Sequence, residues 1–305
     1  MTKRTSWCVV LTLVAATAVC WEWPVADPVI TATFGQPAGD SFLRGIELTG
    51  SDLQVHPVAA GTVIHVSRVG DSRSYVPDGT REGLGNYVVV EHDQGFVTFY
   101  AHLAPEPLPS VGQQVDRTST IGVVGSSGAV LSRTLSFYVY DLLRLNHVNP
   151  LLLLPDFTDS IRPRIDVLYA RVGDQIIDLE QEGALLPGRY QLIANIYDAW
   201  VRGGDHVAPY AVTLYVDGRE RFSVTMERVT LVDGVSRIDP ATRSSFEELY
   251  TPDGLMRLGG VDFDEGTTQI ELVVTDFAGN ESAMSIEVTA ENPTDEDVQQ
   301  EPDGE

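Results

Sequence analysis

The sequence predicts a mostly β protein built from two folded units. No ten-residue window after residue 20 has the apolar periodicity of an amphipathic helix. Short runs rich in β-branched and aromatic residues recur along the chain, separated by Gly, Pro, Asn and Asp. The length of 305 residues is about twice the ~150 residues usual for one domain.

The N-terminus has the pattern of a secretory signal peptide, which we assign to residues 1–20. Basic residues at positions 3 and 4 precede an apolar stretch that is too short to cross a bilayer comfortably. We therefore expect an exported protein of the periplasm or cell envelope. Cleavage after Ala18 fits the small residues before it, whereas a second interpretation makes Cys20 a lipidated first residue and the only attachment to a membrane.

The net charge of -24 argues against polyanionic partners. Binding to nucleic acid or to anionic lipid relies on basic side chains that displace counterions, and the sequence contains no basic run of five or more. We therefore expect no nucleic-acid partner.

The first folded unit is expected over residues 21–155. Its predicted strands lie at 29–34, 61–67, 87–91, 96–102, 121–124 and 135–140. A leucine-rich segment closes this half, and residues 156–163, with prolines nearby and mixed charge, are interpreted as a linker.

The second unit is expected to be an immunoglobulin-like β-sandwich over residues 164–290. Apolar and polar residues alternate at 189–196 and 210–216, and Asp217-Gly218 supplies a tight hairpin turn. A further strand pair, 269–275 and 284–289, flanks the turn at 276–280. The acidic turn at 262–266 lacks the ligand spacing of a calcium loop and is interpreted as solvated. Residues 291–305 carry seven acidic and no basic residues, which predicts a disordered tail.

The order of motifs in the first half points to a known family. Over residues 34–154 the chain resembles the LytM/lysostaphin-type zinc peptidases, which cut the peptide cross-links of bacterial cell walls. The resemblance implies a double-layered β scaffold, the duplicated hybrid motif. The motifs that carry it are Gly-Ile followed by an acidic residue at 45–47, Val-Ala-Ala-Gly-Thr-Val at 58–63, Gly-Asn-Tyr-Val-Val-Val-Glu-His at 85–92, Tyr-Ala-His-Leu at 100–103, Ile-Gly-Val-Val-Gly-Ser-Ser-Gly at 121–128 and Val-Asn-Pro-Leu at 148–151.

The residues that hold zinc in this family are mostly replaced. The family's His-x-x-x-Asp motif aligns with Leu43 and Glu47, and its His-x-His motif aligns with Thr134 and Ser136. Only His102, in the Tyr-Ala-His-Leu segment, is unchanged.

These replacements predict the loss of zinc. A catalytic zinc needs three protein donors and an open position for water. Leu43 has no lone pair, Glu47 carries an extra methylene, and Ser136 is a poor donor beside imidazole. Without the metal the bound water is not activated. We therefore expect no cofactor and no zinc-dependent hydrolysis, with His102 as a vestigial catalytic residue.

The other histidines form no ligand-spaced pair. His92 is interpreted as structural, and His147 and His206 as solvated loop residues. His65 lies in a predicted strand and is kept open as a replacement ligand.

The leading functional hypothesis is an exported pseudoenzyme that binds cell-wall peptide or an envelope protein such as a cell-wall amidase. Degenerate family members that switch on such amidases make this the expectation from the resemblance. One alternative is an active or weakly active metallopeptidase that uses Glu47, His102 and an unrecognised ligand. The other is a structural envelope spacer without a specific partner.

Overall fold

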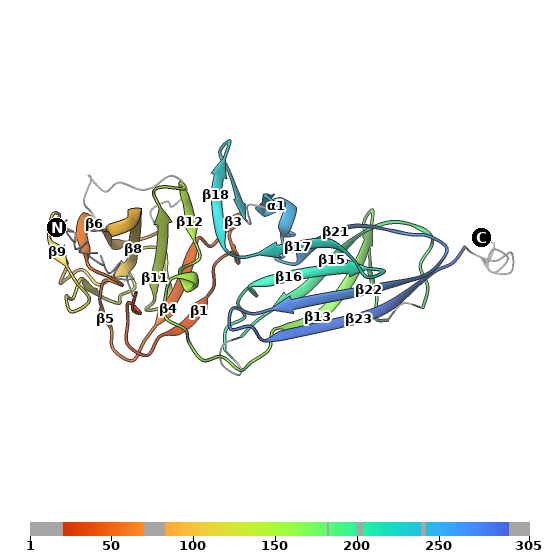
Figure 1. Ribbon diagram of the computed structural model, residues 1–305, viewed down its shortest axis with the longest axis horizontal. Coiled ribbons are helices and arrows are strands. Elements are labelled where there is room, and N and C mark those ends of the chain that lie inside the picture. The colour runs from red at the N-terminus through yellow and green to blue at the C-terminus, as the bar shows by residue number, and fades with distance from the viewer. Residues whose placement is uncertain (1–20, 70–82, 182, 200–203, 239–241, 293–305) are drawn as a thin grey trace, which may run out of the picture.

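The computed structural model describes residues 21–69, 83–181, 183–199, 204–238 and 242–292 (Figure 1). The expected signal peptide, Cys20 and most of the acidic tail lie outside the described residues. The described residues are mostly β, as predicted. They contain one short α-helix, α1 Phe246–Leu249, and two 3₁₀ turns, Asp93–Gly95 and Pro150–Leu152. None of these helices has the length or hydropathy to cross a membrane.

Within the described residues, eleven strands form the sheet of the first half. They are β1 Val29–Ala32, β4 Gly45–Thr49, β6 Gly61–Ser67, β7 Asn86–His92, β8 Phe96–Leu103, β9 Gln114–Val115, β11 Leu135–Asp141, β12 Asn146–Val148, β18 Arg228–Val232, β19 Val235–Ile238 and β20 Ser244–Ser245. The path through the sheet is β20-β19-β18-β12-β11-β8-β7-β6-β9, and β4 joins β1 to β11. Two short pairs complete this half, β2 Pro37–Ala38 with β3 Ser41–Phe42, and β5 Gln54–Val55 with β10 Gly122–Val123.

The two faces of this sheet pack differently. Ile46, Tyr100 and Phe137 are fully buried in the core of the first half. Because side chains alternate along a strand, the neighbouring positions point to the opposite face. There Ala101 and the partly buried ring of Tyr138 belong to a separate, smaller apolar cluster. This second face, called the outer face below, carries the candidate site.

The second half contains two packed four-stranded sheets, consistent with the predicted immunoglobulin-like sandwich (Figure 1). One has the order β14-β13-β15-β21 and the other β17-β16-β22-β23. The bounds are β13 Arg164–Val172, β14 Gln175–Asp178, β15 Gly188–Tyr197, β16 Ala211–Val216, β17 Arg219–Thr225, β21 Met256–Phe263, β22 Gly266–Thr275 and β23 Glu281–Ala290. Leu192 and Leu272, one from each sheet, are fully buried in the shared core. The hairpin turn at Asp217 and Gly218 has both residues at positive φ, 50° and 70°.

The two halves are interlocked. The segment β18–β20 lies in the sequence range that we assigned to the sandwich, yet it extends the sheet of the first half, where Asn146 pairs with Thr230. In the other direction, Phe34 and Phe42 from the first half pack into the core of the second. The linker is therefore not the only connection between the halves.

Polar contacts fix the β18 hairpin on the first half. The Asn149 side-chain amide donates to the carbonyl of Met226 at 2.7 Å, and its backbone N–H donates to Glu227 at 2.8 Å. Arg228 approaches the buried carboxylate of Asp141 at 3.8 Å. The two hydrogen bonds of Asn149 satisfy backbone groups that would otherwise be buried without partners.

Candidate functional site

The candidate site lies on the outer face, where β4 and β11 run side by side. Ser136 is directly opposite Glu47 in the antiparallel register, and Tyr138 is opposite Gly45. Opposite residues of an antiparallel pair point to the same face. Glu47 and Ser136 therefore lie together, with the Ser136 Oγ 3.5 Å from the Glu47 Oε1.

Tyr138 fills the space over Gly45. A Cβ at position 45 would lie 2.6 Å from the Tyr138 ring and 2.3 Å from the Phe137 carbonyl oxygen, so only glycine allows this approach. Burial raises the pKa of the Tyr138 hydroxyl, and a hydrogen bond with Ser136 partly opposes that shift. The hydroxyl therefore stays protonated and acts as a neutral hydrogen-bonding group.

His102 is held in a strained backbone conformation near Glu47. Its φ is 65°, which is uncommon for a residue with a side chain. Its Nδ1 lies 2.8 Å from the Ser127 carbonyl oxygen. Burial lowers the pKa of His102, while the Ser127 carbonyl and the charge of Glu47 act in the opposite direction. The imidazole is therefore oriented by the protein and favoured in its neutral form.

The remaining two predicted positions are buried. Thr134 makes two hydrogen bonds to backbone carbonyls. Its N–H donates to the Gly125 carbonyl at 3.1 Å, and its hydroxyl donates to the Leu48 carbonyl at 3.4 Å. Leu43 precedes β4, exchanges backbone hydrogen bonds with the segment at Gly35 and Gln36, and is 8% exposed. The structure thus brings Glu47, Ser136 and His102 to one region, whereas Thr134 and Leu43 serve as packing and backbone positions beside it.

The side chains at this place do not fit a zinc ion. In the described residues, one group of three or more metal-ligating side chains comes close together, and it contains neither Glu47 nor His102. Leucine and serine stand where nitrogen donors would be needed. We therefore derive no chemical step through a metal. The absence of zinc remains a prediction.

The other histidines are placed as follows. His92 is buried, with its Nδ1 2.9 Å from the Ala60 carbonyl and its Nε2 2.7 Å from the Thr98 hydroxyl. His206 stacks on Tyr197 with ring centroids 3.7 Å apart. His147 belongs to β12 and packs edge-on against Tyr140, so the expectation of a solvated loop is wrong for this residue. Burial lowers its pKa to about 3.

A groove of about 490 Å³ lies on the same outer face of the sheet as Glu47 and Ser136, although neither of these side chains lines it. Its floor comes from the same strands, because Phe99, Tyr140 and Val97 occupy alternate positions on β8 and β11 that share the face of Ser136. His65 from β6 contributes, stacked on Tyr87 with centroids 5.3 Å apart.

The far wall of the groove comes from the second half of the chain. Val229 and Leu231 of β18 and Ser236 of β19 line it. Sequence reasoning missed this wall, because nothing in the sequence of residues 228–238 indicates that they leave the sandwich. The extension makes the groove a composite of both halves.

Arg44 lies in this groove, directly before the first residue of β4. It is half-buried, and burial lowers the pKa of its guanidinium. No acidic side chain in the described part of the chain forms an ion pair with it. A guanidinium that is partly withdrawn from water without a carboxylate partner favours an anionic ligand.

Comparison with known proteins agrees with this architecture. Residues 41–150, about a third of the chain, match the model of peptidase family M23, which confirms the resemblance to LytM-type peptidases. A separate family model matches residues 162–291.

The chain is similar to several curated proteins over this region. The murein hydrolase activator NlpD of Escherichia coli is 29% identical over 135 residues, covering 44% of this chain and 31% of that protein. Outer membrane antigenic lipoprotein B of Haemophilus influenzae is 28% identical over 114 residues, covering 37% and 24%. The chain thus spans less than half the length of these relatives. Among solved structures, the SpoIIQ–SpoIIIAH pore-forming complex matches with a TM-score of 0.35 and 21% identity, covering 45% of this chain and 92% of that one.

Proposed function

We propose that this protein is a non-catalytic M23-domain protein of the cell envelope whose groove binds a carboxylate-bearing peptide. The observation that carries the proposal is Arg44, a half-buried cation without an acidic partner among the described residues, in an otherwise largely apolar groove. The ligand is either a stem peptide of peptidoglycan or an acidic segment of a partner such as a cell-wall amidase.

The groove suits a peptide in shape and chemistry. Tyr87, Phe99 and Leu142 offer apolar contact area. Arg44 offers a planar guanidinium, whose donors can engage both oxygens of a carboxylate. A ligand that combines apolar or aliphatic groups with a carboxylate would use both features.

Binding can persist after catalysis is lost. Hydrolysis requires stabilisation of a transition state, and here the donor set for a water-activating metal is replaced by Leu43 and Ser136. Recognition needs only the groove and its cation, which do not depend on these positions. The neutral, oriented His102 does not line the groove and has a structural role, with its Nδ1 bonded to the Ser127 carbonyl.

The relatives support the location and the kind of partner. One is named an outer membrane lipoprotein and another a murein hydrolase activator. Both names agree with an envelope protein that acts beside peptidoglycan. Because the chain spans only part of these relatives, the partner is proposed on the groove rather than on their names.

The test is binding of the protein without its signal segment to sedimented peptidoglycan and, separately, to purified envelope amidases. We expect Arg44→Gln to weaken the interaction about tenfold or more, because a charge-assisted hydrogen-bonded pair contributes about 1.5–3 kcal/mol. Arg219→Gln is the matched control, since Arg219 is exposed on β17 and does not line the groove.

The two arms separate the sources of the ligand. Binding to peptidoglycan that is lost in Arg44→Gln identifies a stem peptide, and binding to an amidase that is lost in the same variant identifies a protein partner. Retention of all binding in Arg44→Gln would overturn the assignment of the groove. Failure of the wild type in both arms would leave the structural spacer as the better interpretation.

A further inference from the structure

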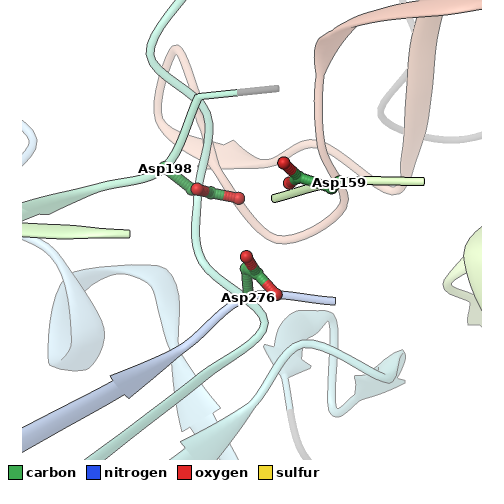
Figure 2. Close-up of side chains that lie close together, drawn as sticks. All are labelled: Asp159, Asp198 and Asp276. Carbon is green, nitrogen blue, oxygen red and sulfur yellow. The ribbon is translucent and has the colours of Figure 1, made fainter. Parts of the chain in front are cut away.

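Three aspartates from distant parts of the sequence meet at the junction of the two halves. Asp159 lies in the connection between them, Asp198 follows β15, and Asp276 follows β22. One carboxylate oxygen from each lies within 4.8 Å of the others. Figure 2 shows the three carboxylates turned toward a common space.

These carboxylates are withdrawn from water. Asp198 is 2% exposed and Asp276 1% exposed, while Asp159 is partly buried. Burying an ionised carboxylate is unfavourable unless it is paired, bound to a cation or neutralised by a proton, and burial raises the pKa of Asp198 to about 7. No basic side chain in the described ranges forms an ion pair with any of the three.

Some of their oxygens have protein partners and some do not. Both oxygens of Asp276 accept hydrogen bonds from Asn280, at 2.8 and 2.7 Å. Asp159 accepts one from the N–H of Ile161 at 2.8 Å through its Oδ1. The Asp159 Oδ2 and the Asp198 Oδ1 are buried and have no hydrogen-bond partner. Asp198 is more than nine-tenths buried, so its oxygen without a partner is a second observation beside the clustering of the three carboxylates. It indicates that a positively charged ligand belongs at this place.

We propose that Asp159, Asp198 and Asp276 bind a calcium ion that joins the inter-domain connection to the end of the sandwich. The donors are all carboxylate oxygens, which hard cations prefer, and the set contains no nitrogen or sulfur donor for zinc. Calcium accepts irregular oxygen arrangements, whereas magnesium demands near-octahedral geometry and retains most of its water. Neighbouring backbone carbonyls and water would complete the shell.

The position of the site gives it a structural role. The Phe157 ring stacks on Phe277 with centroids 6.2 Å apart, one residue beyond Asp276. Asp198 also borders a small cavity shared with Phe34 and Asn149 of the first half. A bound cation would therefore stabilise the orientation of the sandwich relative to the first half. It would also stabilise the position of the β18–β19 hairpin on the sheet of the first half.

The experiment measures thermal unfolding of the whole chain without its signal segment, after removal of metal with EDTA. We expect about 5 mM CaCl₂ to raise the Tm by roughly 2–5 °C, given the ~10⁻⁴–10⁻³ M affinities typical of extracellular calcium modules. Asp198→Asn should abolish this shift. Asp264→Asn, at an exposed carboxylate of the acidic turn 262–266, should retain it and controls for nonspecific binding by a strongly acidic protein.

Each outcome decides the proposal. A calcium shift lost only in Asp198→Asn supports it. No shift in the wild type, or an equal shift in both variants, overturns it, and an equal response to the same concentration of MgCl₂ overturns the assignment of calcium. If Asp198→Asn does not fold, Asp159→Asn replaces it, because that side chain is partly exposed and tolerates substitution better.

Discussion

Ser136 lies directly opposite Glu47 in the β4–β11 pair, with the serine hydroxyl 3.5 Å from the glutamate carboxylate. The resemblance to LytM-type peptidases predicts that both side chains occupy positions of former zinc ligands. The backbone register that would bring two ligands together is therefore in place, while the ligands are not. A strand pairing that can support a metal site can therefore persist after the donor side chains are replaced.

Restoring the donors should restore zinc binding. The variant Leu43→His, Glu47→Asp, Ser136→His and Thr134→His would return the family's pattern to strands that already have the required register. We expect about one zinc per chain by elemental analysis after zinc loading and gel filtration, against a negligible amount in the wild type.

The control is the same variant without Ser136→His, which has one donor fewer and should bind zinc much more weakly. Stoichiometric zinc in the wild type would contradict the account, and so would a folded four-site variant that binds none.

Acid should destabilise the protein through His147. Burial lowers its folded pKa to about 3 from an ordinary 6.5, so between these values the unfolded state binds more protons. Stability therefore rises with pH across this window and is lost as the pH falls below 6.5, by roughly 2 kcal/mol at pH 5. Urea unfolding of His147→Gln at pH 7.5 and 5 should show a correspondingly smaller difference. An unchanged difference would show that His147 does not contribute this pH dependence.

The contact between Asn149 and Met226 should stabilise the docking of the β18 hairpin. Asn149→Ala leaves the Met226 carbonyl buried without its donor at 2.7 Å, which should destabilise the protein by about 1–3 kcal/mol in urea unfolding. Asn195→Ala is the control, because the Asn195 side-chain amide donates to an exposed carboxylate of Asp166, and its loss should cost less than about 0.5 kcal/mol. Equal effects of the two substitutions would argue that the hairpin is held by packing alone.

Much of the strand pattern could be predicted from local sequence. The expected ranges 61–67 and 96–102 correspond to β6 and β8, and 189–196 corresponds to β15. Asp217-Gly218 gives the expected turn because both residues reach positive φ. These features depend on alternation and turn chemistry within a few residues.

Long-range pairing could not be predicted in the same way. The segment at 228–238 alternates like any sandwich strand, and only tertiary contacts such as Asn146 with Thr230 decide that it joins the other sheet. The groove wall that it forms was therefore missed. The three aspartates at 159, 198 and 276 were missed for the same reason, since their separation in sequence has no metal-binding spacing.

The candidate site was accessible from sequence only through the resemblance. Composition does not distinguish Glu47 from other acidic residues of a chain with 44 of them. Its alignment with the family's ligand motif made Glu47 a candidate site residue. Its pairing with Ser136 then places it on the outer face of the sheet. The role of Arg44 depends on burial and on the absence of an acidic partner among the described residues, neither of which a sequence reveals.

We propose that this chain retains a binding groove but no hydrolytic activity, and the most direct test is release of soluble fragments from purified cross-linked murein. The protein, with zinc added, is incubated with the murein and the supernatant is assayed for liberated amino groups. We predict no release above the blank with or without EDTA. Release that depends on zinc and disappears with EDTA would contradict the account.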